Sequence, residues 1–301
     1  MIERAIGVLS FPVVMGLLAI GLVMSVRGEV IEVTDATGEK VDLPVAARRI
    51  ASLSPHLTEL LYAAGAGVAV VGVAEHSDYP PAARRLPVVG GTGKVDAEQV
   101  LALHPDLVVA WGSGIPTTQI ERLRRLGLVV YVSEPRALTD IALELERLGQ
   151  LAGTEAVAKA AALTFLTRLT ELRVRYASRP QVRVFYQVWD HPLVTVGSEH
   201  LISRIIDLCG GRNVFAESSN LAPTISREAV LAANPEVIVA SGVDAHRPAW
   251  LEDWHSWPQL IAVDRNNLFD IPPDLIQRHT SRILEGAGLL CAALETARER
   301  R

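Results

Sequence analysis

The hydrophobic pattern of residues 95–111 recurs 130 positions later, in residues 225–241. Each copy opens with a helix N-cap residue, Asp96 or Ser226, continues for about two helical turns and stops at a proline, which cannot extend a helix. The pattern therefore predicts the same short helix twice. In this register seven residues are identical: Glu98 and Glu228, Val100 and Val230, Leu101 and Leu231, Ala102 and Ala232, Pro105 and Pro235, Val109 and Val239, Ala110 and Ala240.

A continuous apolar run follows each predicted helix, at residues 107–111 and 237–240. Such a run, without alternation, is typical of a strand that helices cover on both faces of a parallel sheet. A helix, a short turn and a parallel strand form a doubly wound α/β unit. Two such units predict an α/β fold of two similar lobes with a cleft between them.

The remaining pattern divides the chain into three parts after residue 28. Residues 29–136 are expected to form an N-terminal lobe that begins with a β-hairpin, and residues 181–301 a C-terminal lobe. Residues 138–177 contain no proline and repeat apolar positions at helical spacing, so segment 137–180 is expected to connect the lobes through one long helix or two consecutive helices. The expected strands are 49–54, 68–73, 128–132, 182–189 and 193–197, and the expected helices are 56–64, 117–126, 201–209 and 281–297.

The first 28 residues form a separate segment. Residues 5–26 are uninterruptedly apolar and follow Arg4, which is typical of an export signal cleaved near Gly28. The run is also long enough to span a bilayer, so an uncleaved N-terminal anchor is the alternative. No cysteine lies near residue 28, which argues against a lipid-attached protein. The expected location is the periplasm, with anchoring to the inner membrane if the segment stays attached.

Composition narrows the functional classes. With 49% hydrophobic and 21% charged residues the chain is an ordinary globular protein. The net charge of −5 becomes −6 without residues 1–28, which disfavours a nucleic-acid partner. The two cysteines, Cys209 and Cys291, favour one disulfide in an exported chain over two buried free thiols.

Three motifs that suggest other chemistry are incomplete. Residues 90–94, GGTGK, lack the first glycine and the final Ser or Thr of a phosphate-binding loop. Trp111 stands where the nucleophile elbow around Ser113 requires glycine. None of the eight histidines has the spacing of a zinc motif, so no metal site is expected. The sequence therefore predicts neither an enzyme nor a resident cofactor.

Aromatic and polar residues gather at the predicted strand ends and loops, where open α/β sheets bind ligands. For Trp111 a place in the core is as good an interpretation as a ligand contact. The candidate ligand-binding residues are Tyr79, Trp111, Trp189, Asp274, Leu275, Ile276, Gln277 and Arg278.

Several longer stretches carry a resemblance to a known family. These are RIASLSPHLTELLYAAG, VVGVAEHSDYPP, EQVLALHPDLVVAW, RVFYQVWDHPLVTVG, DLCGGRNVF, ISREAVLAANPEVIVAS and RHTSRI, which together extend from about residue 49 to residue 294. The chain resembles the periplasmic substrate-binding proteins of ABC importers for cobalamin, haem and ferric siderophores. Within that family it is most similar to the members that bind cobalamin, vitamin B12.

The resemblance implies a fold and a ligand site. It implies two α/β lobes joined by a long helix, as in class III periplasmic binding proteins, with cobalamin held between them. By position, Tyr79, Asp274 and Arg278 correspond to cobalamin contacts, and Cys209 with Cys291 to the family disulfide. Two aromatic positions of the family are absent, because residues 91–93 are Gly-Thr-Gly and residue 222 is alanine. Trp189 is expected to supply the missing ring.

The resemblance also implies a partner. Glu98 and Glu228 fall in the first turn of the repeated helices, where the helix dipole alone favours an acidic residue by only ~0.3–1 kcal/mol. In the family these positions contact the permease of the importer. A pseudo-twofold pair of acids suits a symmetric pair of cations on a permease dimer.

The function predicted from the sequence is therefore capture of cobalamin, or a related corrinoid, and its delivery to an inner-membrane ABC importer. The first alternative is a haem or ferric-siderophore binding protein of the same family. Anionic ligands of that kind call for clustered arginines, and the residues named above offer only Arg278. A membrane-tethered sensor and a doubly wound enzyme are further alternatives, and the enzyme lacks a visible nucleophile or acid–base pair.

Overall fold

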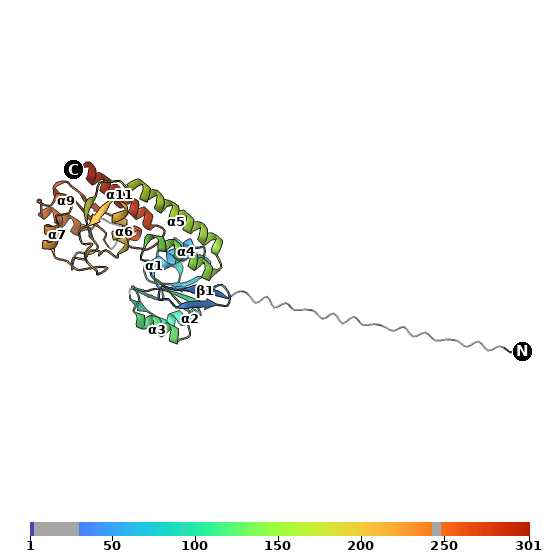
Figure 1. Ribbon diagram of the computed structural model, residues 1–301. Coiled ribbons are helices and arrows are strands. Elements are labelled where there is room, and N and C mark those ends of the chain that lie inside the picture. The colour runs from blue at the N-terminus through green and yellow to red at the C-terminus, as the bar shows by residue number, and fades with distance from the viewer. Residues whose placement is uncertain (3–29, 92, 243–247) are drawn as a thin grey trace.

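The computed structural model describes residues 1–2, 30–91, 93–242 and 248–301. The export signal or anchor expected in residues 1–28 lies outside these ranges, apart from the first two residues. Two α/β lobes make up the described chain, and a long helix, α5 (Glu155–Tyr176), runs along both of them (Figure 1). The α/β class and the two lobes predicted from the sequence are confirmed.

The N-terminal lobe is built on a parallel sheet with strand order β4-β3-β7-β8. A hairpin of β1 (Ile31–Thr34) and β2 (Lys40–Leu43) precedes this sheet, as predicted. The lobe also contains a small hairpin at the GGTGK motif, which was not predicted. The elements of the sheet are β3 (Ile50–Ser52), β4 (Val70–Val73), β7 (Leu107–Trp111) and β8 (Val130–Ser133); the small hairpin is β5 (Gly90–Gly91) with β6 (Lys94–Val95); the helices are α1 (Pro55–Ala63), α2 (Ala97–Ala102) and α3 (Thr117–Arg125), with 3₁₀ turns η1 (Gly67–Ala69) and η2 (Pro81–Arg85).

The C-terminal lobe repeats this design with strand order β10-β9-β11-β12, also parallel. Two of its strands, β10 and β12, were not predicted, because each has only three residues and, unlike the equally short β3, lies in no longer stretch that suggested a strand. The expected strand at 193–197 does not form, since Val194 makes only isolated bridges to Trp189 and Thr224. The elements are β9 (Val182–Gln187), β10 (Gly211–Asn213), β11 (Val237–Ala240), β12 (Leu268–Asp270), α6 (Leu201–Leu208), α7 (Arg227–Ala233), α8 (Ala249–Glu252), η3 (Asp253–Ser256), α9 (Ile261–Asp264), α10 (Pro273–Ile276) and α11 (Ile283–Glu299).

The sequence repeat corresponds to the pairs α2–β7 and α7–β11, one in each lobe. Both predicted N-caps are present: Asp96 accepts a hydrogen bond from the N–H of Gln99 at 3.0 Å, and Ser226 accepts one from the N–H of Ala229 at 3.2 Å. Such caps satisfy backbone donors that a helix start leaves free. The two strands are buried throughout, except for the half-buried last residue of β7.

The connection between the lobes consists of two helices, α4 (Leu138–Ala152) and α5, rather than one. The break falls at Gly153, whose φ of +67° is the left-handed conformation that glycine adopts readily and that ends a helix. The N–H of Thr154 bonds back to the carbonyl of Gly149, which completes this C-cap. Helix α5 is 22 residues long, about 33 Å at 1.5 Å per residue, and spans from one lobe to the other.

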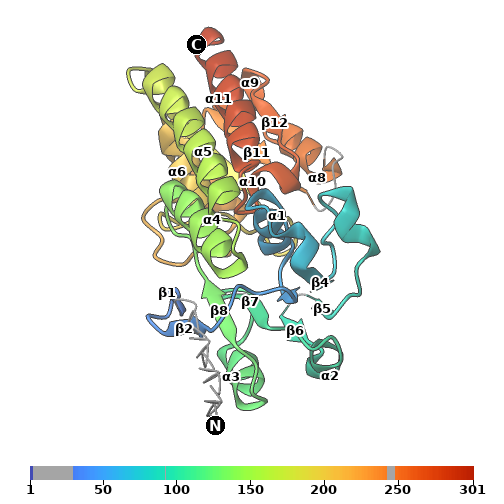
Figure 2. The same cartoon turned by 90° about the vertical axis from the view of Figure 1, so that its right-hand side faces the viewer.

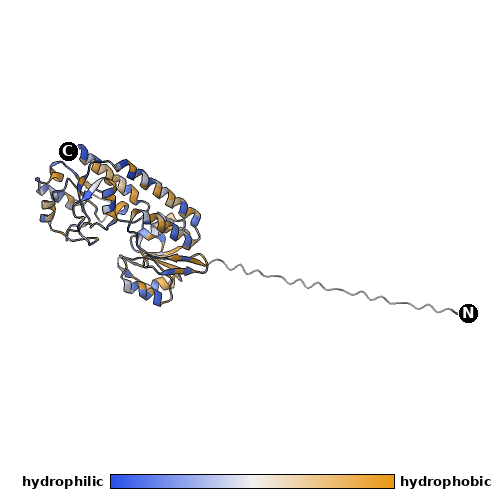
Figure 3. Ribbon diagram, viewed as in Figure 1, coloured by the Kyte–Doolittle hydropathy of each residue, from blue (hydrophilic) through white to orange (hydrophobic). Residues whose placement is uncertain are grey.

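One hydrophobic core extends through both lobes. It joins residues of α1, α4 and α5 with the inner faces of β9, α6 and α11. Two smaller clusters lie outside this core, one on the outer face of each sheet. Hydrophobic residues follow the strands of the N-terminal lobe, whereas hydrophobic and hydrophilic residues alternate along the long helices (Figure 3). A shared core implies lobes that keep a fixed arrangement rather than two independently moving domains.

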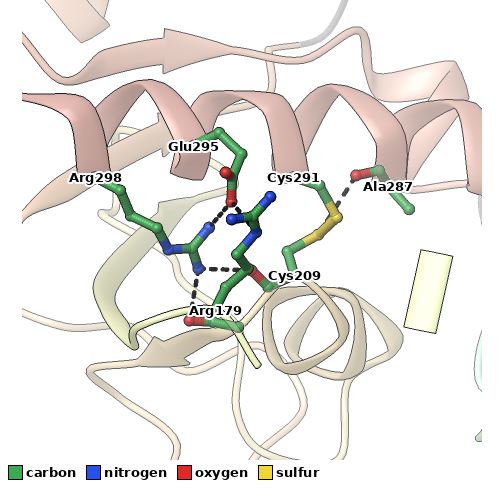
Figure 4. The surroundings of a disulfide bond; sticks show 7 residues. Arg179, Cys209, Ala287, Cys291, Glu295 and Arg298 are labelled. Carbon is green, nitrogen blue, oxygen red and sulfur yellow. Dashed lines mark hydrogen bonds and ion pairs between the residues drawn. A yellow bond between two sulfur atoms is a disulfide. The ribbon is translucent and has the colours of Figure 1, made fainter. Parts of the chain in front are cut away.

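The predicted disulfide between Cys209 and Cys291 is confirmed. It joins the residue that follows α6 to the middle of α11, and both cysteines are fully buried. Close to it, Arg298 donates hydrogen bonds to the carbonyls of Cys209 and Gly210 and pairs with Glu295 (Figure 4). The covalent link and these polar contacts fix α11 against α6.

Candidate functional site

Two cavities lie between the lobes, and each is lined from both sides. The Trp111 cavity has a volume of about 400 Å³. The Tyr79 cavity has a volume of about 330 Å³. Trp111 ends β7 and Glu134 follows β8, so the carboxyl ends of the parallel strands face the first cavity, where open α/β sheets bind ligands. The Trp111 cavity is lined by Trp111, Ser113, Glu134, Pro135, Arg136, Glu199, His200, Leu201, Ser219, Leu221, Ala222 and His279; the Tyr79 cavity by Glu59, Tyr62, Ala63, Tyr79, Pro80, Thr280, Ser281 and Arg282.

Trp111 is half-buried and stands at the meeting point of the lobes. Its ring meets His56 of α1 edge-on, with centroids 5.1 Å apart, and His279 of the C-terminal lobe at 5.9 Å. A Cβ atom at Gly114 would lie 2.0 Å from Cε3 of Trp111, so the ring position requires glycine there. The ring packs against the core and also lines the cavity, and a ligand contact by Trp111 stays a prediction.

His56, His200 and His279 form a ring cluster with Trp111, which the sequence did not predict. His279 lies 5.6 Å from His56 and 6.2 Å from His200, measured between ring centroids. Burial lowers the pKa of all three: that of His56 falls well below its usual range, and those of His200 and His279 fall to about 4. The three imidazoles are therefore neutral at pH 7.

The protonation of His200 predicts how stability depends on pH. Its pKa is about 4 in the folded protein and about 6.5 in the unfolded chain, so the unfolded state binds more protons between these values. We expect the free energy of unfolding to fall by on the order of 3 kcal/mol from this group as the pH drops from about 6.5 to about 4. Urea unfolding at intervals across this range measures the effect.

The control for this prediction is His200→Asn. His200 caps α6 by accepting the N–H of Ile202 at 3.1 Å, and asparagine can keep that cap without titrating. The variant is expected to lose less stability than the wild type over the same pH range. Equal losses in the two proteins would contradict a neutral, buried His200.

An ion network crosses from one lobe to the other beside the Tyr79 cavity. Glu59 of α1 accepts hydrogen bonds from Arg278 at 2.8 Å and from Arg282 at 2.8 and 2.9 Å. Arg278 also pairs with Asp78 at 2.7 Å and with Asp274 at 2.9 Å. In Figure 2, α1 lies next to α10 and α11, the helices that flank the two arginines. The network links the lobes through three carboxylates and two guanidinium groups.

Burial and ion pairing shift the pKa values of Asp78 and Arg278 in opposite directions, and ion pairing has the larger effect. Burial acts to raise the pKa of Asp78, yet the hydrogen bond and charge of Arg278 hold it below its usual value. Burial likewise acts to lower the pKa of Arg278, but its bonds to Asp78 and Glu59 raise it. Asp78 and Arg278 therefore stay ionised in the folded protein over the physiological pH range.

We expect Glu59→Gln to destabilise the protein by about 2–3 kcal/mol. Breaking a fully buried pair costs about 3–5 kcal/mol, and the cost is lower here because Arg278 and Arg282 keep 14% and 19% of their side chains exposed. The matched control is Glu32→Gln, which removes an exposed pair with Lys40 and should leave stability nearly unchanged, because solvent screens such a pair. Equal effects of the two substitutions in urea unfolding would refute a structural role for the network.

Tyr79 lies on the loop after β4, as predicted, with 44% of its surface exposed. The guanidinium carbon of Arg282 is 3.9 Å from the centre of its ring, a cation–π contact. This contact covers one face of the ring and fixes its plane against the C-terminal lobe. Tyr79 is thereby held at the border of its cavity.

Trp189 follows β9 and is also 44% exposed. Its indole N–H donates to the carbonyl of His191 at 3.0 Å, and the next residue, Asp190, pairs with Arg227 of α7 at 3.1 Å. The turn that carries Trp189 is thus anchored to the repeated helix of the C-terminal lobe. The ring is presented on the surface of that lobe.

The predicted run of residues 274–278 divides into two kinds of side chain. Asp274 and Arg278 form an ion pair, and Leu275 and Gln277 are half-buried. Ile276 is fully buried within the core, so its side chain has no surface to offer a ligand, and its selection as a contact is corrected. The apolar residue points inward because α10 packs against α11.

The two positions that lack the family's aromatic residues border cavities. Gly91 and Gly93 line a space of about 130 Å³ next to Trp111, and Ala222 lines the Trp111 cavity. Thr92 lies outside the described residues. At Gly91 the neighbouring space is already taken, because a Cβ atom there would lie 2.3 Å from Oε2 of Glu75.

Glu98 and Glu228 are both exposed in the first turn of their helices, one on each lobe. In Figure 1, α2 and α7 lie on different lobes. Hydrogen bonds from its own backbone N–H and from the Ser226 hydroxyl hold the pKa of Glu228 below its usual value. The carboxylate of Glu228 is therefore ionised at neutral pH and accessible to a partner.

The sequence missed the residues that join the lobes. Glu59 was an acid in an apolar helix, and Arg282 lies four residues after Arg278 in RHTSRI, a spacing that places both on one side of the chain. Ser113 donates to Glu134 at 2.8 Å, which uses the hydroxyl of the incomplete nucleophile motif.

Within the described ranges, no three His, Cys, Asp or Glu side chains are arranged to hold a metal ion. In the same ranges, no helix is both long and apolar enough to cross a membrane.

Comparison with known proteins decides the family. The model of the periplasmic binding protein family matches residues 50–275, which is most of the chain. The chain belongs to the periplasmic binding protein family. This is a family of substrate-binding transport proteins rather than enzymes.

Relatives within the family are similar over most of their length. The chain is 38% identical to the vitamin B12-binding protein of Vibrio cholerae over 257 residues, 85% of this chain and 92% of that protein. It is 38% identical to the vitamin B12-binding protein of Yersinia pestis over 250 residues, 82% of this chain and 86% of the relative.

Solved structures give the same result. The crystal structure of the periplasmic vitamin B12 binding protein BtuF of Vibrio cholerae superimposes with a TM-score of 0.78 and 37% identity, covering 84% of this chain and 98% of that one. A periplasmic heme binding protein from Pseudomonas aeruginosa gives 0.74 and 25% identity, covering 82% and 92%. The two-lobed class III fold is shared by both.

Proposed function

We propose that this protein captures cobalamin in the periplasm and delivers it to an ABC importer of the inner membrane. Relatives named for vitamin B12 binding match over most of the chain at 36–38% identity. The haem-binding structure is less similar in sequence, at 25%. Cobalamin is the transported ligand in this proposal and not a resident cofactor.

The charge of the cleft is the observation that carries the choice of ligand. Four glutamates and two arginines line the Trp111 cavity, the Tyr79 cavity and the smaller space beside Trp111. The sequence suggested a single cleft arginine, which is corrected, because Arg136 and Arg282 also line it. These cations are nevertheless outnumbered by Glu59, Glu75, Glu134 and Glu199.

A net acidic cleft repels a ligand with carboxylates. Haem carries two propionates, and burying an uncompensated charge is costly. Cobalamin is neutral with cyanide as its upper ligand and cationic with water, so it meets no such penalty. Arg278 does not reverse this conclusion, because Asp78 and Asp274, which are not among those four glutamates, also pair with it.

The proposed ligand contacts are flat rings and a polar pair. Trp111 and Trp189 offer aromatic surface, with Tyr79 held in place by Arg282. Asp274 is 45% exposed and Arg278 14%, so Asp274 is the more accessible member of the pair for the amides at the corrin rim. Leu275 and Gln277 lie beside them on the same short segment.

Delivery is assigned to Glu98 and Glu228, which would meet cations on the two halves of a permease dimer. The corresponding location is the periplasm, and residues 1–28 would provide either the export signal or a membrane anchor. Mass spectrometry of the mature protein distinguishes these, since cleavage near Gly28 removes the apolar segment. This docking role and the anchor are separate parts of the proposal.

Titration of the purified protein with cyanocobalamin and with haemin tests the choice of ligand. We expect saturable binding of cyanocobalamin, followed by absorption or tryptophan fluorescence, and much weaker binding of haemin. Tight haemin binding without cyanocobalamin binding would establish the haem alternative instead. Related corrinoids in the same titration define the ligand class.

A further inference from the structure

Three neighbouring rings between the lobes each carry a buried nitrogen without a protein partner. They are Nε2 of His56, Nε1 of Trp111 and Nδ1 of His279, and none has a hydrogen-bond partner among the described residues. Leaving a buried donor or acceptor unpaired costs about 1–3 kcal/mol. Native proteins keep such groups where water or a ligand completes the bond.

The rings that carry these nitrogens come from both lobes and lie close together. His56 and Trp111 belong to the N-terminal lobe and His279 to the segment between α10 and α11. The ring centroids of the three residues are 5.1–5.9 Å apart. Trp111 and His279 also line the Trp111 cavity, so a group that enters this cavity reaches both rings.

The chemistry of the rings limits what they can bind. The indole N–H of Trp111 only donates, whereas a neutral imidazole has one donor and one acceptor nitrogen. His200 accepts the N–H of Ile202 through Nδ1, which places its proton on Nε2. His56 bonds through Nδ1 to the Ser54 hydroxyl at 2.7 Å, so its remaining capacity is at Nε2.

We propose that His279 and Trp111 form a carboxamide subsite that selects an amide of the bound ligand over a carboxylate. The amide carbonyl accepts from Nε1 of Trp111, and the amide NH₂ donates to Nδ1 of His279. A carboxylate can only accept, so it leaves Nδ1 unpaired unless the imidazole becomes charged. Burial makes that charging unfavourable, since it holds the pKa of His279 at about 4.

This subsite rests on the proposed cobalamin function and adds a specificity to it. The corrin rim carries several amides, and mild acid hydrolysis of cyanocobalamin yields its b-, d- and e-monocarboxylic acids. Each of these monoacids replaces a single rim amide by a carboxylate. They therefore probe one position at a time while the rest of the ligand stays constant.

The test is calorimetric titration of the wild type and of variants with cyanocobalamin and the three monoacids at pH 7. We expect one monoacid to bind the wild type at least tenfold more weakly than cyanocobalamin, and the others to bind within about threefold. His279→Leu removes the acceptor, so it should weaken cyanocobalamin about tenfold, the effect of one hydrogen bond, and abolish the discrimination.

Two further variants make the result interpretable. Trp111→Phe keeps an aromatic side chain, although a smaller one, and removes the N–H donor, so it should also weaken cyanocobalamin by about tenfold or more. It stands in for His279→Leu if that variant does not fold. His255→Leu changes a half-exposed histidine elsewhere in the C-terminal lobe and should have no effect on binding.

The outcomes are distinct. Absence of cyanocobalamin binding to the wild type overturns the proposed function and the subsite with it. Normal cyanocobalamin binding with equal affinity for all three monoacids overturns the subsite alone. Unchanged affinities in both His279→Leu and Trp111→Phe also overturn it.

Discussion

Reversing both exposed glutamates, in Glu98→Lys with Glu228→Lys, is expected to reduce cobalamin uptake by on the order of 100-fold or more. Each substitution would place a lysine against a cationic site of the permease, and like charges at an interface cost several kcal/mol. Both residues are exposed and remote from the two cavities, so affinity for cyanocobalamin should stay within about twofold. Uptake is measured in cells that depend on this protein, and affinity on the purified variant.

The control is the same charge change on another face. Glu155→Lys with Glu171→Lys also reverses two exposed glutamates, and Glu155 lies in the first turn of α5, so the loss of a favourable helix-dipole contact is matched. Uptake by this variant should equal that of the wild type. If both double variants lose uptake alike, or if Glu98→Lys with Glu228→Lys loses cobalamin affinity, the assigned docking role is wrong.

The two single charge reversals show whether both lobes or only one lobe contacts the permease. Glu98 and Glu228 occupy equivalent positions of the repeated helices, so a twofold permease should respond to either change with a partial loss. A complete loss from one and none from the other would indicate a single docking lobe. The repeat in the sequence would then reflect shared ancestry of the lobes rather than a shared contact.

The sequence predicted the fold well because the fold is encoded locally. N-cap residues, prolines and apolar runs mark each repeat within fewer than twenty residues, and both caps are present in the structure. Short strands were the exception. The three-residue strands β10 and β12 carry too few residues for a pattern, and 193–197 reads as a strand although its backbone pairs mainly with the turn at Trp189 and the segment before α7.

The candidate site was predicted only in part because its contacts join distant positions. Tyr79, Trp111 and the Asp274–Arg278 pair could be found from strand ends and from the family resemblance. Glu59 could not, since its partners lie 219 and 223 residues away and nothing in its own helix reveals them. The histidine cluster is similar, because rings from residues 56, 200 and 279 meet only when the lobes pack together.

Arg278, predicted as a ligand contact together with Asp274, also holds the lobes together. Its guanidinium group contacts Glu59, Asp78 and Asp274 and the carbonyl of His76. A substitution here therefore changes the link between the lobes as well as any ligand contact. Binding measurements on Arg278→Ala need the stability of the same variant beside them.

Removing the disulfide is expected to lower the free energy of unfolding by about 4–5 kcal/mol. The bond closes a separation of 82 residues, and on the loop-entropy model a loop of this size restricts the unfolded chain by that amount. The substitution to make is Cys209→Ala with Cys291→Ala, because both sites are fully buried and serine would bury a hydroxyl group. Urea unfolding of the variant and of the oxidised wild type gives the difference.

Because of the position of the disulfide, we expect its removal to lower stability without changing the ligand cleft. Helix α6 starts at Leu201 and α11 at Ile283, both next to residues that line the cavities, whereas Cys209 and Cys291 lie about two turns further along. The disulfide therefore ties the two helices away from the site, where Arg298 also bonds to the carbonyls of Cys209 and Gly210. We expect affinity for cyanocobalamin to change by less than about threefold at temperatures where the variant is folded. A stability loss under about 1 kcal/mol would contradict the loop-entropy account, and a large loss of affinity would show that the bond positions the cavity walls.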